Sequence, residues 1–499
     1  MIMNTKELQK LPAADFLCPN DTVYIRSHQV CWETSSDNEY YLEYSYNRLR
    51  WYALNGGCAV LLPQPELPLM QELKRLEPKG CEISLAALRS LQLRYGAPEP
   101  VVLSFAEQVC IPDETAPLPE AVTVSYSNGM TEERPIAWEG MSGVIQAPTY
   151  AAPLISHRAD PYIYKHTDGK YYFMASHTDA GHNLDGKYQY LYLILRCGNS
   201  LEDLTDNSGR YREKIIYERK PIKGGSMSPH LWAPELHFIH GRWYVYYTTT
   251  ISDESSWRIR PHCLECQGSD PMADDWTEKG PIQTTIKGDI AFTDFSLDHT
   301  YLRHNGKDYL LWAQKTNNIS DIFIAELSNP WTVCTPAVRL THPEYNWELH
   351  GFPVNEGPAV LKHGNKIFVT FSASGTDALY CMGLLYADAD SNLLDADSWK
   401  KLPYPVFQSC PETGYYGPGH NSFTTSTDGR DDLFVYHGRQ EARYLGEGDY
   451  QPLYDAGRNA YIGKIFWNAD GMPDFSVPGA SIAAREEDLR IQAVIAASD

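Results

Sequence analysis

The chain has 499 residues, more than one hydrophobic core usually holds, so two domains are expected. Hydrophobic residues make up 43% of the chain and charged residues 21%, a composition typical of folded globular proteins. The formal net charge of -22 disfavours binding to nucleic acid or to an anionic membrane surface. It favours a neutral substrate over a polyanion.

The first residues, MIMNTKELQKLPAADF, lack the apolar core of a signal peptide. No later stretch reaches the ~18 apolar residues that a membrane span needs. The 11 cysteines are an odd number at irregular intervals, which favours reduced thiols over a disulfide framework. The sequence therefore predicts a cytoplasmic protein without a membrane segment.

Residues 1–150 are predicted to form a separate α+β accessory domain. The apolar spacing in Leu67–Leu76 and in Ser84–Tyr95 is helix-like. Ala121–Trp138 has the pattern of a β-hairpin that turns at Asn128-Gly129. The role of this domain stays open between a carbohydrate-binding module, a lid and a surface for homo-oligomerisation.

From residue 156 onward, one pattern occurs five times: an apolar strand, a short polar turn with glycine, and a second apolar strand. Since glycine adopts the positive φ of a tight turn, each copy predicts a β-hairpin. The repeats predict an all-β, five-bladed β-propeller over residues 151–499. A β-sandwich is disfavoured because it does not require evenly spaced hairpins. The turn glycines, 58 to 72 residues apart, are Gly169, Gly241, Gly306, Gly364 and Gly429.

An acidic residue precedes three of these hairpins: Asp160 in RADPYIY, Asp298 in DFSLDHTYL and Glu356 in VNEGPAVL. An isolated carboxylate is usually a solvated turn residue or a strand cap, but three at similar positions favour a functional site. The inner strands of a propeller meet at one mouth of its axis, so these acids are expected to lie together. Glycoside hydrolysis requires such groups: an acid for the leaving oxygen and a carboxylate for water or the sugar carbon. A third carboxylate can keep the acid protonated.

The chain from about Ser156 to Phe475 resembles glycoside hydrolase family 43, in particular its α-L-arabinofuranosidases and β-xylosidases. The matching segments, in order, include HRADPYIYKHTDGKYYF, LWAPELHFIHGRWYVYYT, VNEGPAVLKHGNKIFVTFSA and YGPGHNSFTTSTDG. The resemblance implies that Asp160 is the general base and Glu356 the general acid. It implies that Asp298 modulates the pKa and position of the acid, and that hydrolysis inverts the anomeric carbon.

The same resemblance assigns two further residues. Trp232 matches a position that lines the sugar pocket, although a place in the blade core suits an indole equally well. His420 matches a histidine near the propeller axis that binds a Ca²⁺ or Na⁺ ion through water. A lone imidazole is a poor calcium ligand, so such an ion would be largely hydrated and structural. No cofactor is expected to be required for the chemistry.

The chain departs from the family at Tyr461, where relatives commonly have arginine. Arg439 and Arg458 are alternative candidates for a substrate-binding cation, unless they are solvated strand ends. His299, next to Asp298, is a further candidate for the pocket wall. The pair Cys263 and Cys266 has the spacing of half a zinc site, but no second pair follows, so it is interpreted as two strand thiols.

The leading hypothesis is an inverting, exo-acting α-L-arabinofuranosidase that releases arabinose from neutral arabino- or arabinoxylo-oligosaccharides. A β-xylosidase and an endo-arabinanase stay open, because the same acids serve all three activities. A non-catalytic glycan-binding propeller is the alternative of another class, and the presence of all three acids disfavours it.

Overall fold

The computed structural model describes residues 100–495, except for residues 128, 147–149, 151, 178–182, 185–186, 189, 403, 411–412, 442–451, 469 and 480–488. Before residue 100 it describes the backbone of six strands. The helices predicted at Leu67–Leu76 and Ser84–Tyr95 lie outside the described residues.

Within the described residues the protein is all-β, because the helices found there are four single-turn 3₁₀-helices. These are η1 (Glu202–Leu204), η2 (Asn346–Glu348), η3 (Ala396–Ser398) and η4 (Pro452–Tyr454). None of the helices in the described part is long and apolar enough to cross a membrane.

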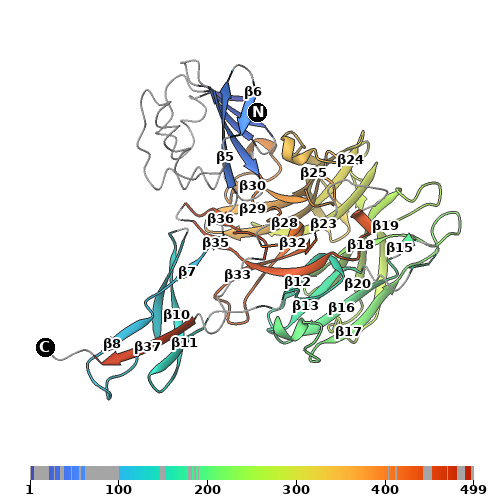
Figure 1. The fold of residues 1–499 in the computed structure, drawn as a ribbon. Coiled ribbons are helices and arrows are strands. Elements are labelled where there is room, and N and C mark those ends of the chain that lie inside the picture. The colour runs from blue at the N-terminus through green and yellow to red at the C-terminus, as the bar shows by residue number, and fades with distance from the viewer. Residues whose placement is uncertain are drawn as a thin grey trace.

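The N-terminal sheet is an antiparallel meander of six strands in chain order (Figure 1). Its strands are β1 (Ile2–Asn4), β2 (Thr22–Arg26), β3 (Gln29–Glu33), β4 (Glu39–Ser45), β5 (Arg48–Asn55) and β6 (Cys58–Leu61). The sequence analysis predicted no strands here, so this sheet adds to the predicted accessory domain.

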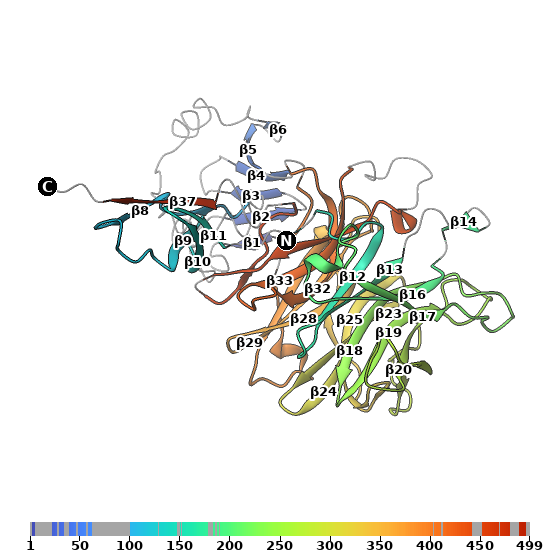
Figure 2. The ribbon, with the colours of Figure 1, turned by 90° about the horizontal axis from the view of Figure 1, so that it is seen from below.

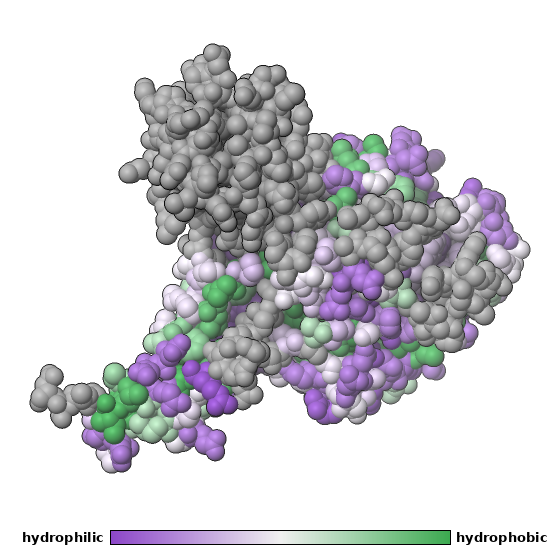
Figure 3. Space-filling model, viewed as in Figure 1, coloured by the Kyte–Doolittle hydropathy of each residue, from purple (hydrophilic) through white to green (hydrophobic). Residues whose placement is uncertain are grey.

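A second six-stranded sheet joins residues from both ends of the chain in the order β7-β9-β10-β11-β37-β8 (Figures 1 and 2). Its strands are β7 (Leu103–Ser104), β8 (Gln108–Ile111), β9 (Ala121–Tyr126), β10 (Thr131–Glu139), β11 (Ser142–Ile145) and β37 (Arg490–Ile495). Strands β9 and β10 form the predicted hairpin, and β37 pairs with β11 and with β8. Figure 3 shows apolar residues among polar ones over this sheet. Val102, just before β7, and Ile495, at the end of β37, are 59% and 47% exposed. The domain boundary at residue 150 stays a prediction.

Five further sheets follow one another between residues 158 and 464. Each contains one of the predicted hairpins, and the first strand of that hairpin is called the first strand of the sheet. All five turn glycines have a positive φ, from 56° at Gly364 to 87° at Gly169. Glycine is suited to these turns because it lacks the Cβ that disfavours this conformation.

These five sheets are numbered first to fifth in chain order. The first sheet has β12 (Arg158–Lys165), β13 (Tyr171–His177), β16 (Tyr192–Gly198) and β17 (Arg212–Glu218), and the second has β18 (Leu231–Ile239), β19 (Arg242–Thr250), β20 (Ile259–Cys266) and β21 (Trp276–Pro281). The third has β22 (Gln283–Thr284), β23 (Phe295–His304), β24 (Lys307–Thr316), β25 (Ile319–Asn329), β26 (Thr332–Val333) and β27 (Val338–Thr341). The fourth has β28 (Asn355–His363), β29 (Lys366–Ala373), β30 (Cys381–Asp388) and β31 (Lys400–Lys401), and the fifth has β32 (Tyr416–Thr425), β33 (Asp432–Arg439) and β34 (Asn459–Lys464). Two short pairs complete the described strands: β14 (Asn183–Leu184) with β15 (Lys187–Tyr188), and β35 (Phe466–Trp467) with β36 (Pro473–Asp474).

The first strands of the five sheets are neighbours in space. Strand β12 contacts β18, β18 contacts β23, β23 contacts β28, β28 contacts β32, and β32 contacts β12. The main hydrophobic core lies between the sheets and includes fully buried side chains such as Leu193, Val245, Leu311 and Val369. Burial of this apolar surface stabilises the arrangement of first strands that carries the site.

Each of these first strands has a β-bulge at the same place. The pairing with the second strand skips between Ala159 and Tyr162 in the first sheet, and the other four sheets repeat this irregularity. The first extra residue of every bulge has a positive φ, and these residues are Asp160, Ala233, Asp298, Gly357 and His420. Asp160 and Asp298 therefore occupy equivalent positions, as predicted, whereas Glu356 lies one residue before its bulge. A bulge changes the direction in which a side chain points, so it decides where these acids point.

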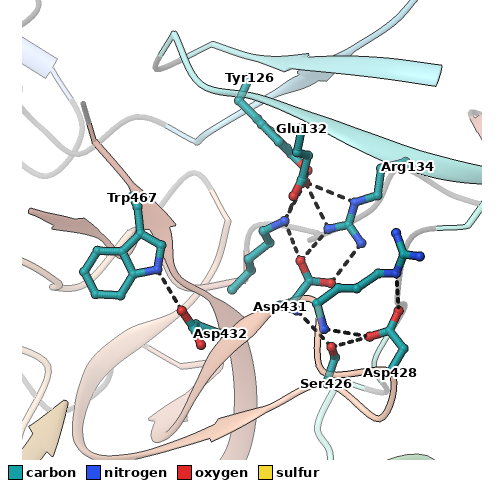
Figure 4. Close-up of polar contacts among 10 residues, drawn as sticks. Tyr126, Glu132, Arg134, Ser426, Asp428, Asp431, Asp432 and Trp467 are labelled. Carbon is teal, nitrogen blue, oxygen red and sulfur yellow. Dashed lines mark hydrogen bonds and ion pairs between the residues drawn. The ribbon is translucent and has the colours of Figure 1, made fainter. Parts of the chain in front are cut away.

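A largely buried charge cluster connects β10 to the fifth sheet (Figure 4). We call it the joint cluster; it consists of Glu132, Arg134, Asp431 and Lys464. Arg134 is 2% exposed and pairs with Glu132 and with Asp431. The Lys464 Nζ lies 2.7 Å from Glu132 Oε1 and 2.6 Å from Asp431 Oδ1. Two acids and two bases balance one another here, which is the condition under which buried charges are tolerated.

Candidate active site

The three predicted acids come together where the first strands meet. Asp160 Oδ1 lies 3.3 Å from Nδ1 of His420, and Asp298 Oδ2 lies 3.9 Å from the same nitrogen. Asp298 Oδ2 also accepts a hydrogen bond of 3.0 Å from the backbone N–H of Gly357, the residue after Glu356. Strands β12, β23, β28 and β32 thus each contribute one side chain to one site.

The acids differ in accessibility. The side chain of Asp160 is 12% exposed and that of Asp298 is 4% exposed. Glu356 is also partly open to solvent. Asp160 and Glu356 are therefore more open to solvent than Asp298.

Asp160 is surrounded by groups that favour its charged form. The Ser176 hydroxyl donates to Asp160 Oδ2 at 2.5 Å, and Arg458 Nη1 lies 3.7 Å from Oδ1. Burial opposes the charge, yet the neighbouring His420, His437 and Arg458 together hold the pKa of Asp160 well below its usual range. Asp160 is therefore a carboxylate at all but very acidic pH.

The two imidazoles near Asp160 are themselves perturbed. Burial lowers the pKa of His437 to about 3 and also lowers the pKa of His420. Both rings are therefore neutral near pH 7. The neighbour of Asp160 that stays positively charged at this pH is the guanidinium of Arg458.

Glu356 is perturbed in the opposite direction. Burial raises its pKa from 4.5 to about 7; Asp160 adds to the increase, and the 2.9 Å hydrogen bond from the Tyr380 hydroxyl opposes it. Burial and the charges of Glu356 and Asp160 also raise the pKa of Asp298 well above its usual value. Near neutral pH the site combines a charged Asp160 with a neighbouring pair, Asp298 and Glu356, that retains a proton. Carboxyl groups whose pKa values are pushed apart are the arrangement that acid–base catalysis needs.

Of the four predicted substrate-binding residues, only Arg458 is seen to approach the acids. Arg439 is 1% exposed and donates from Nε to Asp455 Oδ2 at 2.6 Å, so its charge is paired away from them. His299 is 1% exposed, with Nε2 3.0 Å from the His262 carbonyl oxygen, and its ring stacks on Tyr246. These contacts give no support to a substrate role for His299 or Arg439, which stays a prediction.

Trp232 immediately precedes the bulge of the second sheet and is 6% exposed. Its ring packs against Tyr190, His230 and Trp257, and it belongs to the main core. The core interpretation of this residue is therefore correct, and a contact with sugar stays a prediction. Tyr461, where the chain departs from the family, is 2% exposed and packs among tyrosines.

The predicted ion at His420 meets a poor ligand set. In the part of the chain that the structure describes, no three His, Cys, Asp or Glu side chains are grouped to hold a metal. His420 Nδ1 faces two carboxylates instead. Direct coordination does not fit these residues, and a hydrated Ca²⁺ or Na⁺ ion stays a prediction. The thiols Cys263 and Cys266 are free and buried in β20, as expected.

Three residues that hold the acids were not predicted from the sequence: Ser176, Tyr380 and His437. His437 is fully buried, and its Nδ1 accepts a hydrogen bond of 3.1 Å from the Asp160 N–H. Ser176 and His437 interrupt apolar second strands, YYFMASH and DLFVYHGR. A polar residue in a buried strand needs a partner, and this signal could have identified both.

Comparisons with known proteins show which family this chain resembles. Residues 150–473 match the model of glycosyl hydrolases family 43. The crystal structure of an α-L-arabinofuranosidase from Lactobacillus brevis is 43% identical, with a TM-score of 0.59, over 66% of this chain and 97% of that one. The extracellular exo-α-(1→5)-L-arabinofuranosidases of Streptomyces avermitilis and Streptomyces chartreusis are 43% and 44% identical over 66% and 60% of this chain. The chain spans 64% of the first enzyme and 85% of the second.

The prediction of a cytoplasmic protein is wrong by these comparisons, because both Streptomyces relatives are named as extracellular enzymes. It rested partly on unpaired cysteines. Cys197, Cys263 and Cys381 are buried in strands, and a thiol shielded by packing can stay unpaired without a reducing compartment.

The family model covers well over half of the chain, and the three acids that the family resemblance singled out lie in one cluster. The chain belongs to glycosyl hydrolase family 43.

Proposed function

We propose that the protein is an inverting, exo-acting α-L-arabinofuranosidase that removes terminal arabinose from neutral arabino- or arabinoxylo-oligosaccharides. The observation that carries this proposal is the opposite perturbation of two accessible acids, since the pKa of Asp160 is lowered and that of Glu356 is raised to about 7. The names of the similar enzymes support arabinose as the sugar.

In this mechanism Asp160 is the general base. It is charged and held by Ser176, so its free oxygen can take a proton from the attacking water. Glu356 carries the proton that is donated to the leaving oxygen, so the alcohol departs without negative charge. Asp298 does not touch the substrate. Its position beside Glu356 discourages loss of that proton before the bond breaks.

We also propose that the five sheets form a closed five-bladed propeller around the acids. The contacts of successive first strands, together with that between β32 and β12, support closure. The repetition of the same bulge in all five first strands supports five equivalent blades. An oligomer formed through residues 1–150 stays a prediction.

The activity is tested with p-nitrophenyl α-L-arabinofuranoside and p-nitrophenyl β-D-xyloside on the purified chain. We expect turnover of the arabinofuranoside, with the β-anomer of arabinose appearing first in proton NMR. Turnover of the xyloside alone would identify a β-xylosidase. Binding of sugar without turnover of either would identify a glycan-binding protein.

Linear arabinan separates exo from endo action. We expect arabinose as the only early product, because an exo enzyme removes one terminal unit at each turnover. Early release of arabino-oligosaccharides would show an endo-arabinanase and contradict the proposal.

A further inference from the structure

Four of the five bulges are fixed by the same kind of hydrogen bond. The N–H of the first bulge residue donates to a side chain on the second strand of the preceding sheet, with the fifth sheet preceding the first. The pairs are Ala233 with Ser176 Oγ (2.8 Å), Asp298 with Thr248 Oγ1 (3.4 Å), His420 with Ser372 Oγ (2.6 Å) and Asp160 with His437 Nδ1 (3.1 Å). These acceptors occupy equivalent places, since each pairs across its own sheet with the residue before the bulge.

The third sheet breaks this pattern. Ala313 occupies the place of the acceptor, pairing with Leu297 before the bulge, and it is fully buried. A methyl group accepts no hydrogen bond, so the N–H of Gly357 in the fourth sheet needs another partner. That partner is Asp298 Oδ2, at 3.0 Å.

A comparison with the first sheet shows what the missing oxygen does. There, the Ser176 hydroxyl lies between the bulge N–H of the next sheet and the acid: it accepts from Ala233 and donates to Asp160 Oδ2. In the third sheet no hydroxyl intervenes, and the carboxylate itself binds the next sheet. Asp160 and Asp298 have equivalent backbone positions, yet only Asp298 is drawn to the residue beside Glu356.

We propose that Ala313 is a positioning residue for the reaction: because it lacks a hydroxyl, the Asp298 carboxylate must bind the Gly357 N–H, and this holds Asp298 against the acid Glu356. The inference rests on the proposed function, in which Glu356 protonates the leaving oxygen. The Ala313 side chain has no polar atom, so it acts only through the choice of hydrogen-bond partner.

The test is Ala313→Ser, which supplies the hydroxyl that the other junctions have. Ser176 beside Asp160 shows that a serine and an aspartate fit together in this geometry. We expect the introduced hydroxyl to accept from the Gly357 N–H and to draw Asp298 away from Glu356. Protonation of the leaving group would suffer, so kcat for phenyl α-L-arabinofuranoside should fall about tenfold or more. The loss for the 2,4-dinitrophenyl arabinofuranoside should be much smaller, because that leaving group needs little protonation, and KM should change little.

Ala313→Cys is the matched control, because a thiol adds similar volume but is a weak acceptor and donor. We expect it to keep most of the phenyl activity. The proposal would be overturned if kcat fell equally in the two variants or equally with both substrates. It would also be overturned if Ala313→Ser kept wild-type rates. Inactivity of the wild-type enzyme on both arabinofuranosides would instead overturn the proposed function.

A second variant does not depend on activity and covers the case in which Ala313→Ser fails to fold. Ser176→Ala converts the first junction into the arrangement of the third. We expect its crystal structure to show the Asp160 carboxylate accepting directly from the Ala233 N–H. If the Ala233 N–H does not donate to the Asp160 carboxylate in this variant, a missing hydroxyl does not redirect the acid. The proposal would then be wrong.

Discussion

Two largely buried charge clusters in this protein differ in balance. In the joint cluster, Glu132 and Asp431 are matched by Arg134 and Lys464 (Figure 4). At the active site, three carboxylates face a single guanidinium, Arg458, which lies 3.7 Å from Asp160. The first cluster satisfies its charges, and the second leaves an excess of negative groups.

The excess changes the protonation of the site. At the joint, burial would raise the pKa of Glu132, but Lys464, Tyr126 and Arg134 bring it below 4.5. At the active site, burial outweighs the opposing Tyr380 hydrogen bond and the charges of Arg458 and Lys315, and it raises the pKa of Glu356 to about 7. A balanced cluster fixes two parts of the fold together, whereas an unbalanced one retains a proton that can be transferred.

The largest effect is expected from Glu356→Gln, which removes the transferable proton. We expect kcat to fall about 10²–10⁴-fold, the usual contribution of a general acid. The melting temperature should not fall, because the change removes one of the excess acids. A variant with wild-type kcat for the phenyl arabinofuranoside would show that the unbalanced cluster is not the catalytic one.

At the joint cluster, Arg134→Met should have the opposite result: a loss of stability without a loss of kcat. The substitution leaves Asp431 without its guanidinium, and we expect a loss of about 3–5 kcal/mol in the free energy of unfolding. Urea denaturation measures it, and kcat of the folded fraction should stay near wild type. Arg430→Met is the control: its ion pair with Asp428 joins side chains that are 52% and 54% exposed, and it should contribute at most about 1 kcal/mol. Equal losses in both variants would contradict the special role of the joint.

The pH dependence of kcat/KM should report both acids. Glu356 must keep its proton, so activity is expected to decline as pH rises through about 7. Asp160 must be charged, and its lowered pKa places the acid limb below the usual range of aspartate. Because Asp298 and Glu356 interact, the alkaline limb belongs to the pair. An alkaline limb near 4.5 would contradict the raised pKa of Glu356.

The smallest effect is expected from Tyr380→Phe. The Tyr380 hydroxyl stabilises the charged form of Glu356, so its removal raises the pKa of Glu356 further. The alkaline limb should therefore move to higher pH, by about one unit or less. Tyr461→Phe, a buried tyrosine that bonds Asn459, should leave the limb in place. A shift to lower pH in Tyr380→Phe would mean that the hydroxyl does not stabilise the charged carboxylate.

Much of this site could be predicted from sequence, because glycine turns and alternating apolar strands are local signals. All five hairpins and the meeting of Asp160, Asp298 and Glu356 followed from them. The bulges could not be predicted in this way, since Asp160, Ala233 and His420 share no residue type that marks a positive φ. Their conformation is set by hydrogen bonds to the neighbouring sheet, which are contacts between distant residues.

The partners of the predicted residues could not be identified from the sequence for the same reason. Arg439 and Arg458 look alike in sequence, and only the fold brings Asp455 to the first and Asp160 to the second. The return of β37 to the sheet of β8 and β11 depends on pairing across more than 300 residues and has no local signal.

The protonation of Glu356 can be measured directly by ¹³C NMR of the folded enzyme labelled at the glutamate side-chain carboxyls, with Glu356→Gln and Glu132→Gln to assign the two signals. We expect the Glu356 signal to titrate near pH 7 and the Glu132 signal below 4.5. A Glu356 signal that titrates at or below 4.5 would contradict the claim that the unbalanced cluster retains a proton for catalysis.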